Sequence, residues 1–261
     1  MKRFLIVTIL IWLQCAVSFA AQVDEELSDD EKAQQGIKIV SERLQKDFPF
    51  SVEARIFFPN MDAHIKSHEI KIDDDALSLK SFGMDSNVAP EYILRYKNFS
   101  VDYIRLKGDG GNSVDDLTFG GQTYNGVVNS ESDLHYIKLN VDREIISLMG
   151  TKAAWNYGIT GVKWRGSFED GTENYFFPIP TIGIALEMKI QPKVKVYTNI
   201  SGVVMGGHGH LCDFEGGFAY IADENFLWKV GYRHIDAKVN WRSVHGDFKL
   251  NGFYTGLRAD F

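Results

Sequence analysis

The sequence predicts an all-β protein, an antiparallel up-and-down transmembrane β-barrel of about ten strands with a short N-terminal helix. From Phe50 onward, apolar residues recur at every second position, which is the period of a strand with one apolar face. Beyond the first 20 residues, no apolar run approaches the roughly 20 residues of a membrane-spanning helix. Because backbone groups in lipid must all be hydrogen-bonded, strands that cross a membrane close into a barrel.

The first 20 residues have the pattern of a secretory signal peptide. Lys2 and Arg3 precede the apolar run 4–13, and Ser18-Phe19-Ala20 places small residues at the −3 and −1 positions of a cleavage site. Cleavage there predicts a mature chain of 21–261 and changes the formal net charge from −7 to −9, since two bases are removed. That acidic balance argues against nucleic acid as a partner, because nucleic acid calls for a basic surface.

Residues 21–48 form a separate periplasmic segment in this prediction. Ser28 and Glu31 fit a capping box at a helix start, and Ile37, Val40 and Leu44 follow on one helical face. Two interpretations stay open. The segment is a short amphipathic helix, on the periplasmic side or plugging the barrel, or it is a loosely ordered acidic arm.

Alternation marks the strands of the predicted barrel over residues 49–261. In the first strand, Val52, Ala54 and Ile56 alternate with Glu53 and Arg55. Further apolar faces begin at Tyr92, Phe99, Ile137, Ile182, Val194, Phe214 and Phe226. The segment 153–168 is aromatic and glycine-rich, with irregular alternation.

The last strand has one apolar and one polar face. Phe253, Thr255, Leu257, Ala259 and Phe261 share the face predicted to point outward, and Tyr254, Arg258 and Asp260 share the other. A strand of this pattern that ends on phenylalanine resembles the closing strand of bacterial outer-membrane β-barrels. This resemblance implies a location in the outer membrane and contact with the barrel-assembly machinery during biogenesis.

The connections predict the topology. Tight links at Lys97-Asn98, Gln191-Pro192 and 223–225 fall on the periplasmic side if the first strand rises from there. Polar links over 66–89, 108–126 and 169–180 are predicted to be long outer loops, the 144–152 link is intermediate, and Asn125-Gly126 is predicted to be an outer hairpin turn. This gives ten strands, with eight or twelve as alternatives because 66–89 and 113–128 have room for further strand.

Aromatic residues are expected at both membrane interfaces. Trp155, Tyr157, Phe226 and Trp228 fall near predicted periplasmic ends, and Trp164 and Trp241 near predicted outer ends. Trp155 and Trp164 have opposite parity, as do Trp228 and Trp241, so either a bulge shifts the register or one member of each pair points inward.

Charged residues on the polar strand faces are predicted to point into the lumen. They are Arg55, Arg95, Lys138, Asp142, Glu187, Lys189, Lys195, Arg233, Arg258 and Asp260. In a narrow barrel such charges pair with one another and fill the lumen, whereas the alternative is a narrow polar channel. Water-filled porins use 16 to 18 strands, and a mature chain of this length fits ten, so a large pore is not expected.

Metal ligation has two weak candidates. His208, His210 and Cys212 supply ligand types that suit zinc or copper, but a structural zinc site needs a fourth ligand and none is obvious nearby. The acidic groups 73–75 and 115–116 supply oxygen ligands that suit calcium, although solvated acidic loops also explain them. No metal or other cofactor is predicted.

Catalysis also has weak candidates near predicted outer ends. Ser243, His245 and Asp247, with His234 and Asp236, supply hydroxyl, imidazole and carboxylate groups, and Ser67-His68-Glu69 adds a second set. A triad is defined by hydrogen-bond geometry, so polar rim residues are the preferred interpretation. No catalytic residue is therefore assigned, and a binding site is not predicted.

Several stretches resemble a family of uncharacterised small Gram-negative outer-membrane β-barrel proteins. They are Ile72-Asp73-Asp74-Asp75-Ala76-Leu77-Ser78-Leu79-Lys80, Phe82-Gly83-Met84, Val88-Ala89-Pro90, Phe119-Gly120-Gly121-Gln122-Thr123-Tyr124, Pro178-Ile179-Pro180 with Gly183, Gly231-Tyr232-Arg233 and 253–261. The acidic signature has Phe82-Gly83 where the family has a leucine-glycine ending. The resemblance covers most of the mature chain and implies fold and location, but no activity.

The expected function is a structural or surface-binding role through the outer loops, without catalysis. An outer-membrane hydrolase acting on lipid or peptide at the outer rim is one alternative, and a narrow channel is another. The expected partners are outer-membrane lipids and lipopolysaccharide, and the protein is expected to be a monomer.

Overall fold

A computed structural model describes residues 50–66, 70–72, 77–80, 88–119, 121–148, 150–168, 171–241 and 244–261. The predicted signal peptide over 1–20 and the predicted helix or arm over 21–48 lie outside these residues and stay predictions. Within the described residues, no helix has the length and hydropathy to cross a membrane.

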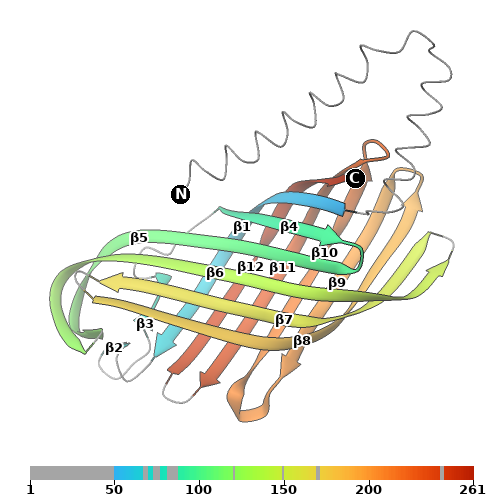
Figure 1. Cartoon of the computed structure of the whole chain (residues 1–261). Coiled ribbons are helices and arrows are strands. Elements are labelled where there is room, and N and C mark those ends of the chain that lie inside the picture. The colour runs from blue at the N-terminus through green and yellow to red at the C-terminus, as the bar shows by residue number, and fades with distance from the viewer. Residues whose placement is uncertain are drawn as a thin grey trace, which may run out of the picture. The chain divides into compact units, whose positions relative to one another are not determined.

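Ten long strands form a closed antiparallel barrel in which each strand pairs with its neighbours in the sequence (Figure 1). The strands are β1 (Phe50–Lys66), β4 (Ala89–Tyr96), β5 (Phe99–Phe119), β6 (Gln122–Leu148), β7 (Thr151–Phe168), β8 (Gly171–Gln191), β9 (Val194–Val204), β10 (Gly209–Ile221), β11 (Phe226–Trp241) and β12 (Val244–Asp260). A 3-10 turn, η2 (Gly206–His208), links β9 to β10. The prediction of an up-and-down barrel of ten strands is confirmed.

The last strand closes the barrel against the first. β12 pairs with β1 from Ser51 opposite Asp260 to Lys66 opposite His245. The amide of Phe261 donates a 2.8 Å hydrogen bond to the carbonyl of Phe50. Both faces of β12 match the prediction, since the Tyr254 side is buried while Phe253 and Leu257 are exposed outside. With this pairing every barrel strand has a hydrogen-bonded neighbour on each side, which is the arrangement that lets strands cross a membrane.

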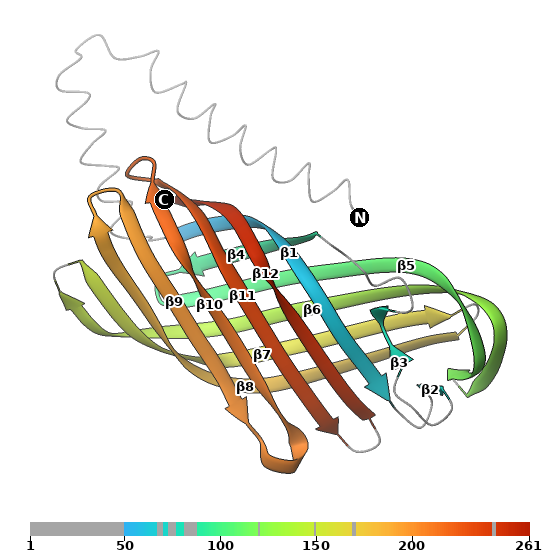
Figure 2. The same ribbon diagram turned by 180° about the vertical axis from the view of Figure 1, so that it is seen from behind.

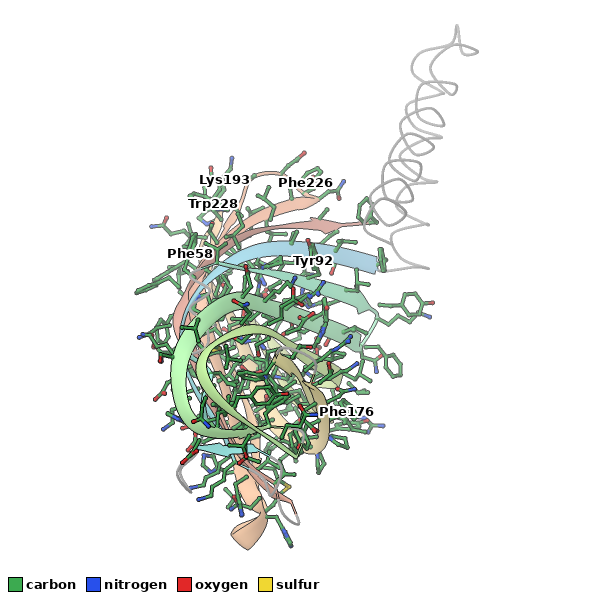
Figure 3. All side chains as sticks on the ribbon, turned by 90° about the vertical axis from the view of Figure 1, so that its left-hand side faces the viewer. Phe58, Tyr92, Phe176, Lys193, Phe226 and Trp228 are labelled. Carbon is green, nitrogen blue, oxygen red and sulfur yellow. The ribbon has the colours of Figure 1, made fainter. Side chains whose placement is uncertain are left out.

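An apolar belt surrounds one end of the barrel. Its members are large apolar side chains that point outward and are exposed, and Figure 3 labels Phe58, Tyr92, Phe226 and Trp228 among them. Others include Phe50, Ile56, Leu94, Tyr96, Phe99, Val101, Leu139, Trp155, Tyr157, Ile159, Ile182, Ile184, Leu186, Ile200, Phe218, Tyr220, Val230, Phe253 and Leu257. On β1 the belt runs from Phe50 to Phe58, which is about the length that a tilted strand needs to cross a bilayer.

The strands continue past the belt at the end opposite Phe50 and Phe261. Because outer-membrane barrels extend further on the outside than on the periplasmic side, we call this the outer end. The tight links at 97–98, 192–193 and 222–225 lie at the other, periplasmic end, as predicted. The link between Leu148 and Thr151, within the predicted intermediate connection 144–152, also lies there.

Two of the three predicted long outer loops are strand. β5 continues to Phe119, β6 begins at Gln122 and β8 begins at Gly171, so the predictions of loops over 108–126 and 169–180 are wrong. Above the belt the outer wall faces water, so a strand there needs no apolar residues on its outward face. Polar, glycine-rich composition therefore does not distinguish strand from loop in this part of the chain.

The predicted hairpin turn at Asn125-Gly126 is instead part of a β-bulge. The β5–β6 register shifts between Val114 and Leu117, and the amide of Asp116 donates a 2.7 Å hydrogen bond to Asn125 Oδ1. Gly126 lies opposite Val114 at a φ of 97°, a conformation that favours glycine. Beyond the bulge the tip of the hairpin curves round at the outer end (Figures 1 and 2), and its last pair is Phe119 opposite Gln122.

The connection from β1 to β4 contains two short strands, β2 (Ile70–Ile72) and β3 (Leu77–Ser78). β2 pairs with the tip of β5, and β3 pairs with the outer end of β1. Neither crosses the membrane, so this extra strand does not raise the number of barrel strands to twelve.

The directions of the tryptophan side chains explain why Trp155 and Trp164 have opposite parity. Trp155 and Trp228 point outward and are about half exposed, at 48% and 51%. Trp164 points inward and donates a 2.7 Å hydrogen bond from Nε1 to Ser132 Oγ. The alternative that one member of this pair points inward is therefore confirmed, and Trp164 is not part of an outer girdle. The side chain of Trp241 lies outside the described residues.

Candidate functional site

The interior of the barrel has three zones from the periplasmic to the outer end. The first is an open vestibule, the second is a layer of paired charges, and the third is an apolar core. Each zone follows from the inward parity of the strands, because the same strands turn their apolar residues outward to the lipid.

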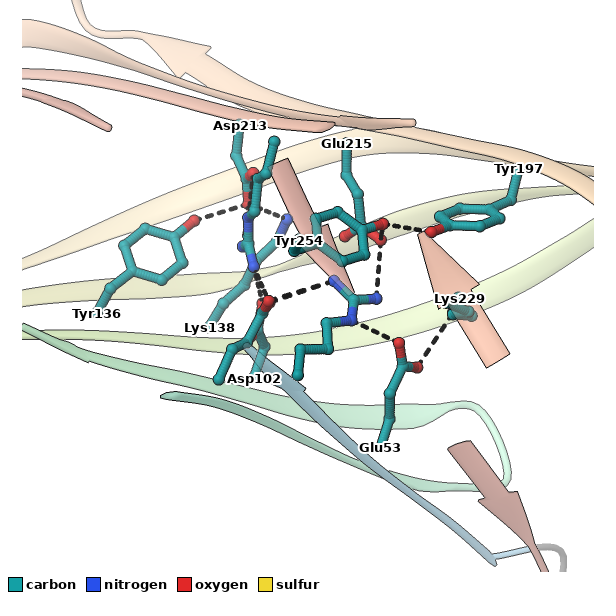
Figure 4. Close-up of polar contacts among 12 residues, drawn as sticks. Glu53, Asp102, Tyr136, Lys138, Tyr197, Asp213, Glu215, Lys229 and Tyr254 are labelled. Atoms are coloured by element: carbon teal, nitrogen blue, oxygen red, sulfur yellow. Dashed lines mark hydrogen bonds and ion pairs between the residues drawn. The ribbon is translucent and has the colours of Figure 1, made fainter. Parts of the chain in front are cut away.

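One half of the charged layer is built around Arg233, and Figure 4 labels Asp102, Lys138 and Asp213 from this half. Its guanidinium contacts Asp213 at 2.9 Å and Asp102 at 2.8 Å, and it also pairs with Glu91. Asp213 in turn accepts hydrogen bonds from Lys138 Nζ at 2.7 Å and from the Tyr136 hydroxyl at 2.8 Å. Residues from β4, β5, β6, β10 and β11 therefore meet across the lumen.

The other half is built around Arg55 and Glu53 of β1. Arg55 bonds Glu53 at 2.5 Å and Glu215 at 2.8 Å, and reaches Glu91 at 3.3 Å, which joins the two halves. Glu53 also pairs with Lys229 at 3.0 Å and Arg95 at 2.7 Å. The Tyr254 hydroxyl donates a 2.7 Å hydrogen bond to Glu215 and also contacts the Tyr197 hydroxyl.

The charged layer is balanced. Its carboxylates are Glu53, Glu91, Asp102, Asp213 and Glu215, and its bases are Arg55, Arg95, Lys138, Lys229 and Arg233. An isolated charge buried this deeply is strongly unfavourable, and pairing with hydrogen bonds offsets that penalty. The layer is therefore a plug in which each charge requires its partners.

The vestibule below the layer opens to the periplasmic end and has a volume of about 540 Å³. Lys195 pairs with Glu187 at 2.7 Å on its wall, and Arg258 pairs with Asp260 at 2.6 Å. Asp142 also lines it. The predicted lumen-facing charges lie in the layer or the vestibule, except Lys189, which is exposed at the periplasmic end of β8.

The list of predicted lumen-facing charges missed six of the ten charged residues of the plug. Glu53, Glu91, Asp102, Asp213, Glu215 and Lys229 were not among the predicted lumen-facing residues. Parity alone could have found Asp213 and Glu215, because they alternate with the outward Phe214 and precede Phe218 on the same strand. Which base each carboxylate meets depends on strands far apart in the sequence, such as β1 and β11.

The outer zone is an apolar core that continues past the belt. Phe57, Leu106, Leu134 and Ile235 are buried in its lower part, with exposures of 0% to 2%. At the outer end, Leu77, Leu79, Leu117, Phe119 and Phe168 belong to the same buried cluster, and the rings of Phe119 and Phe168 lie 4.3 Å apart. The bent β5–β6 tip and the β1–β4 connection therefore contribute apolar side chains that cover the core.

The weak metal candidates lie outside the lumen. His208 is exposed in η2, while His210 and Cys212 point outward from β10. His210 Nε2 lies 3.3 Å from Asp236 Oδ1. Among the described residues, no group of three or more histidine, cysteine or acidic side chains is arranged to hold a metal ion. Residues 73–75 and the Asp115 side chain lie outside the description, and Asp116 is exposed at the bulge.

The weak catalytic candidates do not assemble in the described part of the chain. His234 and Asp236 point outward from β11, and His245 Nδ1 lies 3.1 Å from Asn240 Oδ1. Asp247 is opposite His64, not beside a serine. Ser243 and residues 67–69 lie outside the described residues. Neither His234 nor His245 has a serine partner where the chain is described.

The fold and the belt define the class of protein. A closed ten-stranded barrel with an outward apolar belt, short periplasmic turns and an extended outer end is an outer-membrane β-barrel, and the belt places it in that membrane. No protein-family model matches the chain, and no curated protein matches it either.

Solved structures match the fold. The outer membrane protease OmpT from Escherichia coli is 7% identical with a TM-score of 0.51, covering 82% of this chain and 97% of that one. Neisserial surface protein A is 15% identical with a TM-score of 0.35, covering 81% and 97%. The translocator domain of the autotransporter NalP from Neisseria meningitidis is 10% identical with a TM-score of 0.39, covering 94% and 98%. At this identity the OmpT likeness concerns the fold alone.

Proposed function

We propose that this protein is a sealed, non-catalytic outer-membrane barrel with a structural or surface-binding role at its outer end. The observation that carries the proposal is the outer platform, by which we mean the part of the barrel beyond the apolar belt. In it, β5 from Arg105 and β6 up to His135 form a long hairpin with an apolar interior and a polar outer wall. Crossing the membrane does not require this platform, so it favours a task at the surface.

The filled interior supports a non-conducting barrel over the alternative of a narrow channel. An ion on the axis would first meet the charged layer, where Arg233 and Arg55 are buried among carboxylates. It would then meet the apolar core, where Phe57 and Leu106 have no exposure. Ions need a continuous polar path, and two closures in series oppose one.

The described side chains also favour binding over hydrolysis. A hydrolase needs a nucleophile or water held beside a base, with donors for the developing charge. His234 and His245 lie on the outer wall, and neither has a serine partner among the described residues. We therefore propose outer-membrane lipids and lipopolysaccharide as partners of a monomeric barrel.

Two measurements on purified, refolded protein test this function. Planar bilayers that contain lipopolysaccharide should show no steady conductance after insertion. Phospholipid and lipid A should not be turned over, whether the parent protein or the His234→Ala and His245→Ala variants are used. Reproducible single-channel steps would replace the proposal with the channel, and turnover that either histidine variant abolishes would replace it with the hydrolase.

A further inference from the structure

The outer wall of β5 to β8 changes from apolar to cationic within one step along the strands. In the last apolar row, the register aligns Tyr103, Ile137, Gly161 and Pro178. The next outward-facing row aligns Arg105, His135, Lys163 and Phe176, and the one after it aligns Lys107, Asp133, Arg165 and Asn174. The residues between these rows, such as Leu106, Leu134 and Trp164, are buried inside.

The four lysines and arginines of these two rows differ in their ion pairs. Arg105 forms a two-pronged pair with Asp133, in which Nε lies 2.9 Å from Oδ1, and Lys107 lies 3.7 Å from Glu131. Neither Lys163 nor Arg165 forms an ion pair with any part of the chain that the structure describes. We call Arg105, Lys163 and Arg165 the cationic patch. Its unpaired positive charge at the upper edge of the apolar belt comes from Lys163 and Arg165, because the charge of Arg105 is paired with Asp133.

The opposite wall differs just above its own last apolar row. There the last apolar row is Phe58, Phe253 and Tyr232, and the row above it is Asn60, Asn251, His234 and Phe214. This row contains no lysine or arginine. Lys249 comes one row further out, between Asp62 and Asp236. Cations next to the belt are therefore concentrated on the β5–β7 side.

We propose that the cationic patch binds a phosphate group of a lipopolysaccharide molecule in the outer leaflet. A phosphorylated lipid whose chains lie against the belt holds its phosphate just beyond the apolar zone, which is the height of Arg105 and Lys163. These two residues lie two strands apart, roughly 10 Å, so their long side chains can converge on one phosphate. The inference deepens the surface-binding role proposed above and rests on it.

Apolar contacts beside the patch suit the acyl chains of such a lipid. Ile159 on β7 and Leu139 on β6 are about half exposed below it. Phe176, labelled in Figure 3, is 57% exposed in the same row as Lys163. The β5–β8 wall therefore combines apolar surface for acyl chains with positive charge for a phosphate. The opposite wall, built from β10, β11, β12 and β1, offers apolar surface but no lysine or arginine in the row just above its last apolar row.

Binding of purified lipopolysaccharide to the refolded full chain in detergent tests the site. The test variant is Lys163→Gln/Arg165→Gln, which keeps long polar side chains but removes both free charges. The matched control is Lys238→Gln/Lys249→Gln, which removes two lysines from the opposite wall. Native mass spectrometry or calorimetry measures the affinity, and the shift in gel mobility on boiling verifies that each variant is folded.

We expect saturable binding that weakens roughly tenfold in the Lys163/Arg165 variant, while the control variant matches the parent. Dephosphorylated lipopolysaccharide should bind the parent as weakly as the test variant binds the intact lipid. Equal affinity of test and control variants, equal affinity for dephosphorylated lipid, or stronger binding of phosphatidylglycerol would overturn the site. Conductance or turnover would refute the proposed function separately, because neither assay depends on these two residues.

Discussion

Arg233→Met tests whether the charged layer holds the barrel together. Arg233 is 1% exposed at its side chain and has three carboxylate partners, with Asp102 at 2.8 Å and Asp213 at 2.9 Å as well as Glu91. Its guanidinium also lies 5.3 Å from the centre of the Tyr136 ring. Methionine keeps much of the length but removes the charge and every donor, so the balanced layer gains one uncompensated negative charge.

The expected loss follows from burial. The three partner carboxylates are 0%, 11% and 2% exposed at their side chains, and removing one member of a buried ion pair typically costs about 3–5 kcal/mol of unfolding free energy. Arg258→Met is the matched control, because Arg258 bonds Asp260 at 2.6 Å but both side chains are part-exposed, at 24% and 31%. A pair of that kind contributes at most about 1 kcal/mol.

Equilibrium urea unfolding of the protein refolded into lipid vesicles measures both losses. A second change, Asp102→Asn in the Arg233→Met background, makes the layer neutral again and should recover part of the lost stability. Comparable small losses for Arg233→Met and Arg258→Met would refute the reasoning, as would a double variant less stable than Arg233→Met.

Three further predictions concern the closure of the barrel between β1 and β12, the apolar core at the outer end, and ion conduction through the lumen. Gly252→Ala places a Cβ about 1.9 Å from the Phe58 carbonyl oxygen, so little of this variant should fold. On an unboiled detergent gel, the band of folded barrel should be strongly reduced. Gly246→Ala, on the same strand, meets nothing within 4 Å and should fold like the parent. Phe119→Ala removes a fully buried ring and should lower the urea unfolding free energy by about 3–5 kcal/mol, against less than about 0.5 for the 77%-exposed Val127→Ala. Arg233→Ala should stay non-conducting in planar bilayers, because the apolar core still closes the lumen; steady current would show that the charged layer is the sole seal.

Period-two alternation predicted the membrane part of this fold well. On β1 and β12, lipid outside and a packed lumen inside impose opposite demands on successive residues, so Ile56, Phe58 and Leu257 reveal the outward face directly. The tight turns at 97–98 and 222–225 were also recognisable, since polar residues interrupt two apolar strands there.

The outer end was less readable for a physical reason. Above the belt the outward residues of β5 and β6 face water, so stretches such as Gly108-Asp109-Gly110 carry no alternating apolar face. They look like loop in composition, yet the hairpin continues through them because the ladder with the neighbouring strand supplies the hydrogen bonds. The predicted hairpin turn at Asn125-Gly126 is instead a bulge opposite Asp116, and the two strands continue beyond it.

The sequence also predicted only part of the candidate sites. Parity placed Arg55, Lys138 and Arg233 in the lumen, but it did not identify Glu91 or Asp213 as their partners. The patch at Lys163 and Arg165 was missed altogether, because strand parity in 153–168 was irregular in the sequence. Its height relative to the belt depends on the registers of four strands.

By itself, the sequence determined the outward faces of strands such as β1 and β12, the closing role of the segment ending at Phe261, and the membrane setting. These follow from local alternation, since each residue either meets lipid or it does not. Only the tertiary structure decided which charges meet in the plug, that an apolar core closes the outer half, and which cations stand at the edge of the belt. Those features depend on register between strands distant in the chain, and a one-residue slip would change every one of them.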